Sequence, residues 1–167
     1  QRVPFGSPWV MVALVTTGFL ASTAATSLPS YIASTGLDVG LAPSVVATAQ
    51  VLGSLACATT RIGAPLSVSR GTPLRRLVVI GVLLSVGMLG YLSLSTGTAA
   101  GFVIGTVAAY AFGWGWNGLF NLVVIGVRPD SIAAATGMTQ AGVFLGGMVG
   151  PLTFAAVVHN HGFGTAW

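Results

Sequence analysis

Five long apolar runs, joined by short polar connections, constrain the fold of this chain more than any other feature. Each run has at least the ~18–20 residues that a helix rising ~1.5 Å per residue needs to cross ~30 Å of hydrocarbon. The strands of a membrane barrel would instead alternate in polarity over ~10 residues. The sequence therefore predicts an all-α membrane bundle forming one domain over residues 1–167, with spans at Pro8–Ser34, Leu41–Leu66, Leu77–Ser95, Ala99–Val127 and Ile132–Val158.

The charge content supports a bilayer as the solvent of this chain. Charged residues make up 5% of the sequence and hydrophobic residues 54%, whereas a soluble domain carries roughly 25% charge. The net charge of +4 comes from six arginines, and there is no lysine or glutamate. Arginines near the ends of spans orient helices and contact anionic lipid headgroups. We therefore expect membrane lipids, and no nucleic acid, as partners.

The arginines also predict an orientation. Five of them fall on one side of the predicted bundle and none in the loops or tail of the other side; they are Arg2, Arg70, Arg75, Arg76 and Arg128. Basic residues near span ends stay on the cytoplasmic side. We expect a multi-pass protein of the plasma or inner membrane, with a cytoplasmic N-terminus and an external C-terminal tail.

Polar side chains recur on single faces of the spans. Side chains at i, i+4, i+7 and i+11 share a helical face, and amides have no good partner among lipid tails. We therefore expect these faces to turn toward protein or a wet cavity. The residues assigned to a substrate pathway are Gln50 in the second span, Tyr110, Trp114, Asn117 and Asn121 in the fourth, and Gln140 in the fifth.

Two of these assignments leave alternatives open. Single Ser, Thr and Asn side chains in membrane helices often serve as hydrogen-bonding glue between helices, although we favour the pathway role for Asn117 and Asn121. Arg61, on the same face as Gln50, either snorkels from the second span to the cytoplasmic interface or acts as a gate contact or anchor for an anionic substrate. Trp116, on another face, is expected to pack.

Two further patterns predict how the helices pack. Gly142, Gly146 and Gly150 recur at every fourth residue of the fifth span, and such stripes let helices approach closely. The third span, Leu77–Ser95, has few polar side chains in its centre. We expect it to face lipid more than the other spans do and to stand behind them.

The sequence contains no recognisable catalytic or cofactor-binding set. His159 and His161 have no Cys, Asp or Glu nearby and so make no credible zinc site. Cys57 is the only cysteine. No nucleophile with a base and an orienting group can be assembled from these spans. We predict neither an enzyme nor a cofactor or metal site.

The fifth span and one loop resemble a known family. The fifth span reads Ala-Thr-Gly-Met-Thr-Gln-Ala-Gly-Val-Phe-Leu-Gly-Gly-Met-Val-Gly-Pro-Leu over residues 135–152, which resembles the eleventh transmembrane helix of major facilitator superfamily transporters. The second loop resembles the family's cytoplasmic signature of a glycine, an Asp-Arg pair, a glycine and an arginine pair. Ser69 replaces the acid, and the spacing of the arginines is longer than usual. The residues that carry this resemblance are Gly63, Arg70, Gly71, Arg75 and Arg76.

This resemblance implies a fold and a function. The chain would be helices seven to eleven of the C-terminal half of a transporter, and its partners would be the missing N-terminal half and the twelfth helix. Such proteins move a small solute by alternating access around a site near the midplane. The chain begins at Gln1 and not at Met, and we expect it to be a piece of a longer protein. The alternative is a small stand-alone membrane subunit that serves assembly or scaffolding without transport.

Overall fold

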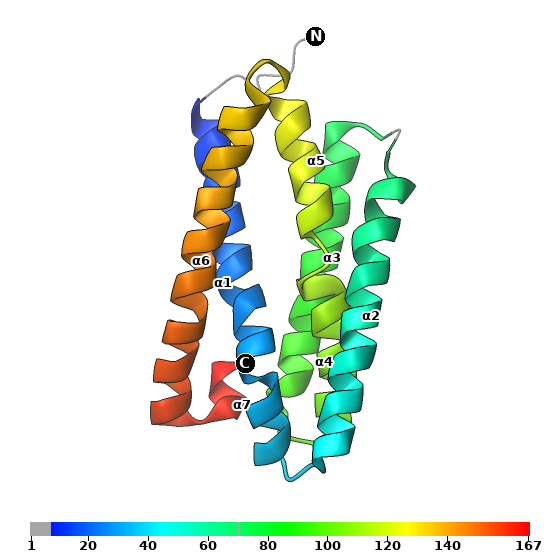
Figure 1. The fold of residues 1–167 in the computed structure, drawn as a ribbon, viewed down its shortest axis with the longest axis vertical. Helices are drawn as coiled ribbons and strands as arrows, with labels where there is room; N and C mark the ends of the chain where they lie inside the picture. Colours follow the sequence, from blue (N-terminus) through cyan, green and yellow to red (C-terminus); the bar gives the residue numbers. More distant parts are fainter. Residues whose placement is uncertain (1–7, 70) are drawn as a thin grey trace.

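The computed structural model describes residues 8–69 and 71–167, and none of these residues lies in a strand. Five candidate membrane spans run along the length of the molecule (Figure 1). Four are the α-helices α1 (Pro8–Asp38), α2 (Pro43–Ser67), α3 (Pro73–Leu94) and α6 (Ile132–His161). The remaining span consists of α4 (Ala99–Ala108), the π-helix η1 (Ala109–Gly113) and α5 (Asn117–Val127). A 3-10 turn, η2 (Pro129–Ser131), precedes α6, and a short helix, α7 (Phe163–Ala166), follows it.

The helices differ from the predicted spans at some of their ends, where the chain turns. The first helix continues through Asp38, four residues beyond the predicted end, because the chain turns only at Gly40, whose φ is +84°. The third helix begins four residues early, at Pro73, since the Thr72 side chain accepts a hydrogen bond from the Arg75 N–H and caps it. A proline at the first helical position lacks only an N–H that the helix does not use. Arg75 and Arg76 therefore lie in a helical turn and not in the predicted loop.

The helices form two groups, α1 with α6 on one side and α2, α3 and the interrupted span on the other (Figure 1). The predicted glycine stripe of α6 lies against the backbone of α1. A Cβ atom added at Gly142 would lie 2.8 Å from the Val15 carbonyl oxygen. Added at Gly146 or Gly150 it would meet the carbonyls of Phe19 and Thr23 more closely still. The close packing predicted from the stripe is confirmed.

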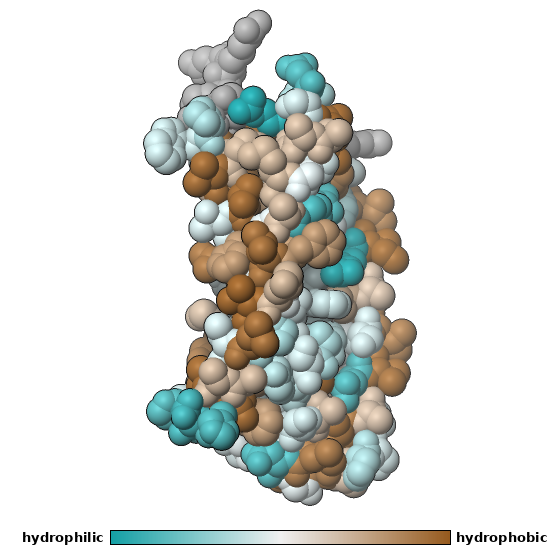
Figure 2. All heavy atoms as spheres, turned by 60° about the vertical axis from the view of Figure 1, so that its left-hand side comes forward, coloured by the Kyte–Doolittle hydropathy of each residue, from teal (hydrophilic) through white to brown (hydrophobic). Residues whose placement is uncertain are grey.

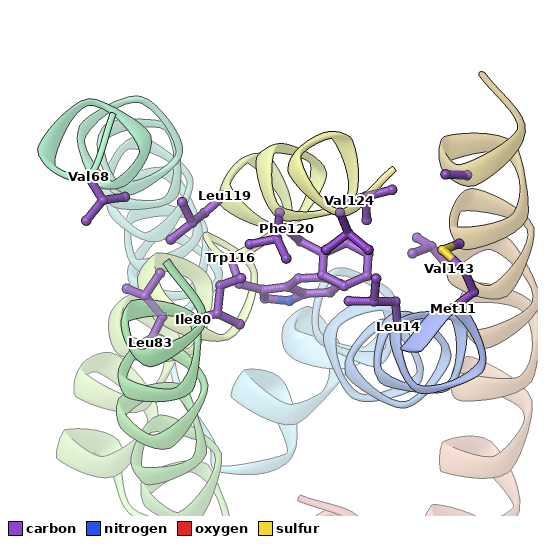
Figure 3. Packing of buried hydrophobic residues seen from close by; sticks show 13 residues of the cluster. Met11, Leu14, Val68, Ile80, Leu83, Trp116, Leu119, Phe120, Val124 and Val143 are labelled. Atoms are coloured by element: carbon purple, nitrogen blue, oxygen red, sulfur yellow. The ribbon is translucent and has the colours of Figure 1, made fainter. Parts of the chain in front are cut away.

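The core has two clusters, one toward each end of the bundle. The first surrounds Trp116, with Ile80 of α3 on one side and Leu14 of α1 on the other (Figure 3). The second contains Phe102 and Tyr110 of the interrupted span, packed with α1, α2 and α3. The interruption in the fourth span falls between these two clusters.

The surface suits a hydrocarbon environment. Hydrophobic side chains cover most of the height of the face seen in Figure 2, with hydrophilic ones at the two ends and in a small group at mid-height. Large apolar side chains are more than half exposed on every span; examples are Leu20, Leu55, Val82, Ile104 and Leu152. The chain thus has the architecture of a multi-pass membrane protein, with five helices long and apolar enough to cross a bilayer.

The described arginines at helix ends gather at one end of the molecule. Arg75 and Arg76 begin α3 and Arg128 follows α5, and both connections lie at the end where α1 starts (Figure 1). We call this the arginine end. Asp38 and His159 lie at the opposite end, which also holds α7. Arg2 and Arg70 lie outside the described residues.

Within the described chain, α3 is not the most exposed of the spans. In the most apolar segment of α3, 28% of residues are buried, whereas the value for α2 is 22%. The reason is a close contact between α3 and η1. A Cβ atom at Gly87 would lie 2.5 Å from the Gly113 nitrogen, and one at Gly90 would lie 2.6 Å from the Ala109 nitrogen. The third span therefore supports the interruption from behind.

Candidate functional site

The fourth span is broken at its centre. The sequence predicts one uninterrupted helix over Ala99–Val127, but residues 114–116 are a turn between the π-helix η1 and α5. Gly115 is required here, since a Cβ atom would meet the Ala111 carbonyl and lie 2.6 Å from the Thr60 Cγ2 atom. The Gly-Trp-Gly-Trp sequence at residues 113–116 is the signal that sequence reasoning missed, because clustered glycines mark breaks. Short π-helical segments are frequent at functional sites.

Arg61 of α2 covers this break. Its Nε–H donates a long hydrogen bond of 3.4 Å to the Trp114 carbonyl oxygen, and its guanidinium lies over the Trp114 ring, 5.0 Å from the centroid. Trp114 is near the middle of the span that runs from Ala99 to Val127. The side chain therefore reaches from α2 toward the middle of the interrupted span. Both functional alternatives, a gate contact and an anion anchor, agree with this position.

A cavity of about 510 Å³ lies beside this contact. Its walls come from the middle parts of α1, the interrupted span and α6, and from Arg61 in the last third of α2. Among the described side chains, none from α3 lines it. The lining residues are Ser22, Ala25, Thr26, Arg61, Trp114, Trp116, Asn117, Val143, Phe144, Gly147 and Met148. A pocket of this volume falls in the ~300–1,000 Å³ range typical of small-molecule sites.

A second, smaller cavity of about 200 Å³ also lies at Arg61 and Trp114. It is lined by Ser54, Cys57, Ala58, Arg61, Tyr110 and Trp114. Arg61 and Trp114 therefore line both cavities. The predicted face of Tyr110 and Trp114 is therefore turned toward α2, as expected from their spacing.

A chain of amides joins the interrupted span to α6. The Gln140 Nε2 donates to the Asn121 Oδ1 at 2.9 Å, and the Asn121 Nδ2 donates to the Asn117 Oδ1 at 3.5 Å. The three side chains are partly buried. Three of the residues assigned to the pathway, Asn117, Asn121 and Gln140, are thus joined by hydrogen bonds. Asn117 alone of the three lines the larger cavity, and its NH₂ group has no acceptor within the described part of the chain.

The other predicted pathway residues are placed differently. Tyr110 is buried, with its ring over Gly53 of α2, where a Cβ atom would lie 2.9 Å from the ring. Gln50 is partly exposed on α2 and lines neither of the two cavities at Arg61. Gln50 therefore lies apart from these two cavities. Its helical face continues to Ser54 and Cys57, which do line the smaller cavity.

Trp116 combines the predicted packing role with one that the sequence did not indicate. It is 2% exposed and meets Phe120 edge to face, with the ring centroids 5.3 Å apart. It also lines the larger cavity, and its Nε1–H has no hydrogen-bond acceptor among the described residues. Ser22 and Thr26 of α1 likewise line the cavity without having been assigned to it. Their spacing of four residues on one face was the available signal.

The loop signature forms a local structural unit at the arginine end. The Arg76 side chain donates to the Ser69 carbonyl at 3.0 Å and to the Val68 carbonyl at 3.5 Å, so it fastens the turn between α2 and α3. The Ser69 hydroxyl, at the place of the family's acid, donates to the Leu66 carbonyl. Gly63 has open space around it. Arg70, a further signature residue, lies outside the described residues; Gly71 and Arg75 complete the set.

Metal-binding groups do not gather in the described part of the chain. Over residues 8–69 and 71–167 no group of three or more His, Cys, Asp or Glu side chains could hold an ion. His159 and His161 lie exposed in the last turn of α6, and Cys57 is a buried free thiol.

Neither a protein-family model, nor a curated protein, nor a solved structure matches this chain. The geometry of the cavity is therefore the basis for a functional interpretation.

Proposed function

We propose that the chain is part of a secondary active transporter of the major facilitator type, which moves a small solute across the membrane by alternating access. In this proposal the chain is helices seven to eleven of the C-terminal half, and the partner is an N-terminal half that lies outside this sequence. The observation that carries the proposal is the cavity of about 510 Å³ between four spans, whose largely apolar walls include the polar side chains Ser22, Thr26, Arg61 and Asn117.

The interruption of the fourth span supports this function on physical grounds. Non-helical backbone at membrane depth is tolerated only where it is buried in protein or lines a cavity. Transporters commonly build their substrate sites from such discontinuous helices near the midplane. Here the turn at residues 114–116 lies beside the cavity, and Trp114 and Trp116 line it. The absence of α3 residues from the lining also agrees with a supporting third helix.

The Arg61–Trp114 contact suits a gate. Alternating access requires contacts that close one side of a site while the other side opens. Arg61 and Trp114 line both cavities, so a movement of these two side chains would reshape both spaces. The carbonyl that Arg61 covers belongs to the broken turn, which has fewer helical hydrogen bonds to hold it in place.

The proposed orientation places the arginine end in the cytoplasm. Single cysteines at Thr72, in the turn between α2 and α3, and at Gly162, between α6 and α7, are introduced in a Cys57→Ala background. An impermeant thiol reagent added to intact cells is expected to label Gly162→Cys, and to label Thr72→Cys only after permeabilisation. Labelling of both positions in intact cells would contradict the orientation.

The test of the function is Asn117→Leu in the full-length transporter, with uptake and efflux measured over a panel of solutes. We expect transport to fall at least tenfold while membrane abundance stays near that of the wild type. The matched control is Asn160→Leu, which removes an exposed asparagine of the last turn of α6. Unchanged transport at normal abundance would contradict the pathway role. A loss of abundance would assign Asn117 to packing. A full-length wild type that transports nothing would favour the assembly subunit.

A further inference from the structure

We propose that the solute held in the larger cavity is an organic anion with a compact apolar body, and that Arg61 is its counter-charge. This inference rests on the proposed function and adds the chemical class of the substrate. It comes from three properties of the same cavity: an arginine without a carboxylate, hydrogen-bond donors without acceptors, and largely apolar walls.

The first property is the charge. The chain has two acidic residues, Asp38 and Asp130. Asp38 is the last residue of α1 and Asp130 lies in η2, so neither belongs to the middle of a span. The contacts of Arg61 with the Trp114 ring and carbonyl leave its positive charge in place. A charge held at membrane depth is costly unless it is paired, and a bound anion would supply the pair.

The geometry of Arg61 leaves its strongest donors available. Only the Nε–H is engaged with the Trp114 carbonyl. A guanidinium has five N–H donors, and the outer pair of nitrogens matches the two oxygens of a carboxylate. The side chain is exposed and lines the cavity, so a solute can reach it.

The second property is the excess of donors. Trp116 lines the cavity, but its Nε1–H is buried without an acceptor and is not itself open to the cavity. The Asn117 carbonyl oxygen already accepts from Asn121, which leaves its NH₂ group to donate. Carboxylate oxygens accept up to about four hydrogen bonds, so an anion satisfies donors that a cationic solute would leave unpaired.

The third property is the character of the walls. Besides these polar groups, the lining consists of aromatic, aliphatic and thioether side chains, among them Trp114, Phe144 and Met148. Such walls favour an aromatic or short aliphatic body over a sugar or a free inorganic ion. A cation would face Arg61 directly, and a neutral solute would leave its charge unpaired.

The experiment measures binding to the full-length transporter in nanodiscs. The probes are radiolabelled benzoate, phenylacetate and hexanoate, and the competitors are the amide and the amine of the same carbon skeleton. We expect at least one carboxylate to bind saturably, and its amide and amine to compete at least tenfold more weakly. Arg61→Gln is expected to reduce that binding at least tenfold, and Arg61→Lys to retain part of it.

The control variant is Arg75→Gln, which removes an arginine at the start of α3, away from both cavities, and is expected to bind as the wild type does. Each variant is checked for a wild-type gel-filtration profile. If Arg61→Gln does not fold, the relative affinities of the carboxylate, the amide and the amine for the wild type show whether the cavity selects an anion.

Three outcomes would overturn the inference: equal or tighter binding of an amide or amine, unchanged carboxylate binding in Arg61→Gln, or no binding of any carboxylate. If an amide or amine binds as tightly as the carboxylate or more tightly, its binding is also measured in Asn117→Leu. Loss of that binding would show that the solute occupies the cavity, and the proposed function would still stand. The proposed function itself fails only in the transport test of Asn117→Leu.

Discussion

The seam between α1 and α6 and the region around Trp114 lie at the same depth in the bundle, but they are built in opposite ways. In the seam, Gly142, Gly146 and Gly150 bring the two backbones into contact and leave no space for a ligand. Around Trp114 the fourth span is broken, its side chains are large, and a cavity of about 510 Å³ remains. One region is closed by small residues, and the other is held open by a break.

Both regions include α6, so the packing of this helix affects each of them. On one face of α6 the glycines meet α1, and on another face Phe144 and Met148 line the cavity. A close helix pair thus holds one wall of the cavity, while the interrupted span forms the other. We infer that the seam supplies the rigid side of the site and that the broken span supplies the side that changes.

The largest expected loss of stability comes from a substitution in the seam between α1 and α6. In Gly146→Ala the new methyl group would meet the Phe19 carbonyl, which belongs to the backbone and cannot rotate away. Overpacking of this kind costs about 1–3 kcal/mol, and we expect the upper part of that range, measured as a lower midpoint of unfolding in detergent.

The matched control is Gly137→Ala on the same helix, where nothing lies within 4 Å of the added atom. Helix propensity there favours alanine by up to about 1 kcal/mol. Equal stability of Gly146→Ala and Gly137→Ala would contradict the close contact between α1 and α6.

An intermediate effect is expected in the amide chain that links the two regions. The Gln140–Asn121 hydrogen bond of 2.9 Å joins α6 to the interrupted span. Interhelical hydrogen bonds in membranes are worth about 0.6–2 kcal/mol. A double-mutant cycle of Gln140→Leu and Asn121→Leu, followed by unfolding in detergent, should therefore give a coupling of about 1 kcal/mol. The pair Gln140→Leu and Asn160→Leu should be additive, and a coupling near zero in the first pair would show that the link does not stabilise the fold.

The smallest effect is expected for Trp116→Phe, on the side of the break. The substitution removes part of a buried ring, which destabilises the fold, but it also removes an N–H that has no acceptor. An unsatisfied buried donor costs about 1–3 kcal/mol, so we expect the two changes to offset each other to within about 1 kcal/mol in the same unfolding assay. A loss as large as that of Gly146→Ala would show that the indole N–H has a partner.

The sequence predicted the first of these regions much better than the second. The glycine stripe is a local pattern, and its consequence is confirmed at Gly142, Gly146 and Gly150. The break has a local signal, the clustered glycines of residues 113–116, and it is accompanied by a tertiary contact, since Gly87 and Gly90 of α3 lie against the backbone of η1. Apolar content alone reveals neither feature, so residues 99–127 were predicted as one helix. Helical spacing placed Asn117 and Asn121 on one face, where they are joined by a hydrogen bond, but it could not show that Gln50 lies apart from the cavities or that Trp116 lines the larger one.

The most direct test of the central idea, that the break at Trp114 opens a water-accessible solute site, is the thiol reactivity of Asn117→Cys. The variant is made in a Cys57→Ala background and treated with a water-soluble, membrane-impermeant thiol reagent in membrane fragments open on both sides. The control is Val82→Cys, which places a thiol at mid-span on the exposed face of α3. We predict that Asn117→Cys reacts at least tenfold faster than Val82→Cys. Equal, slow reaction of both thiols would contradict a wet cavity at the break.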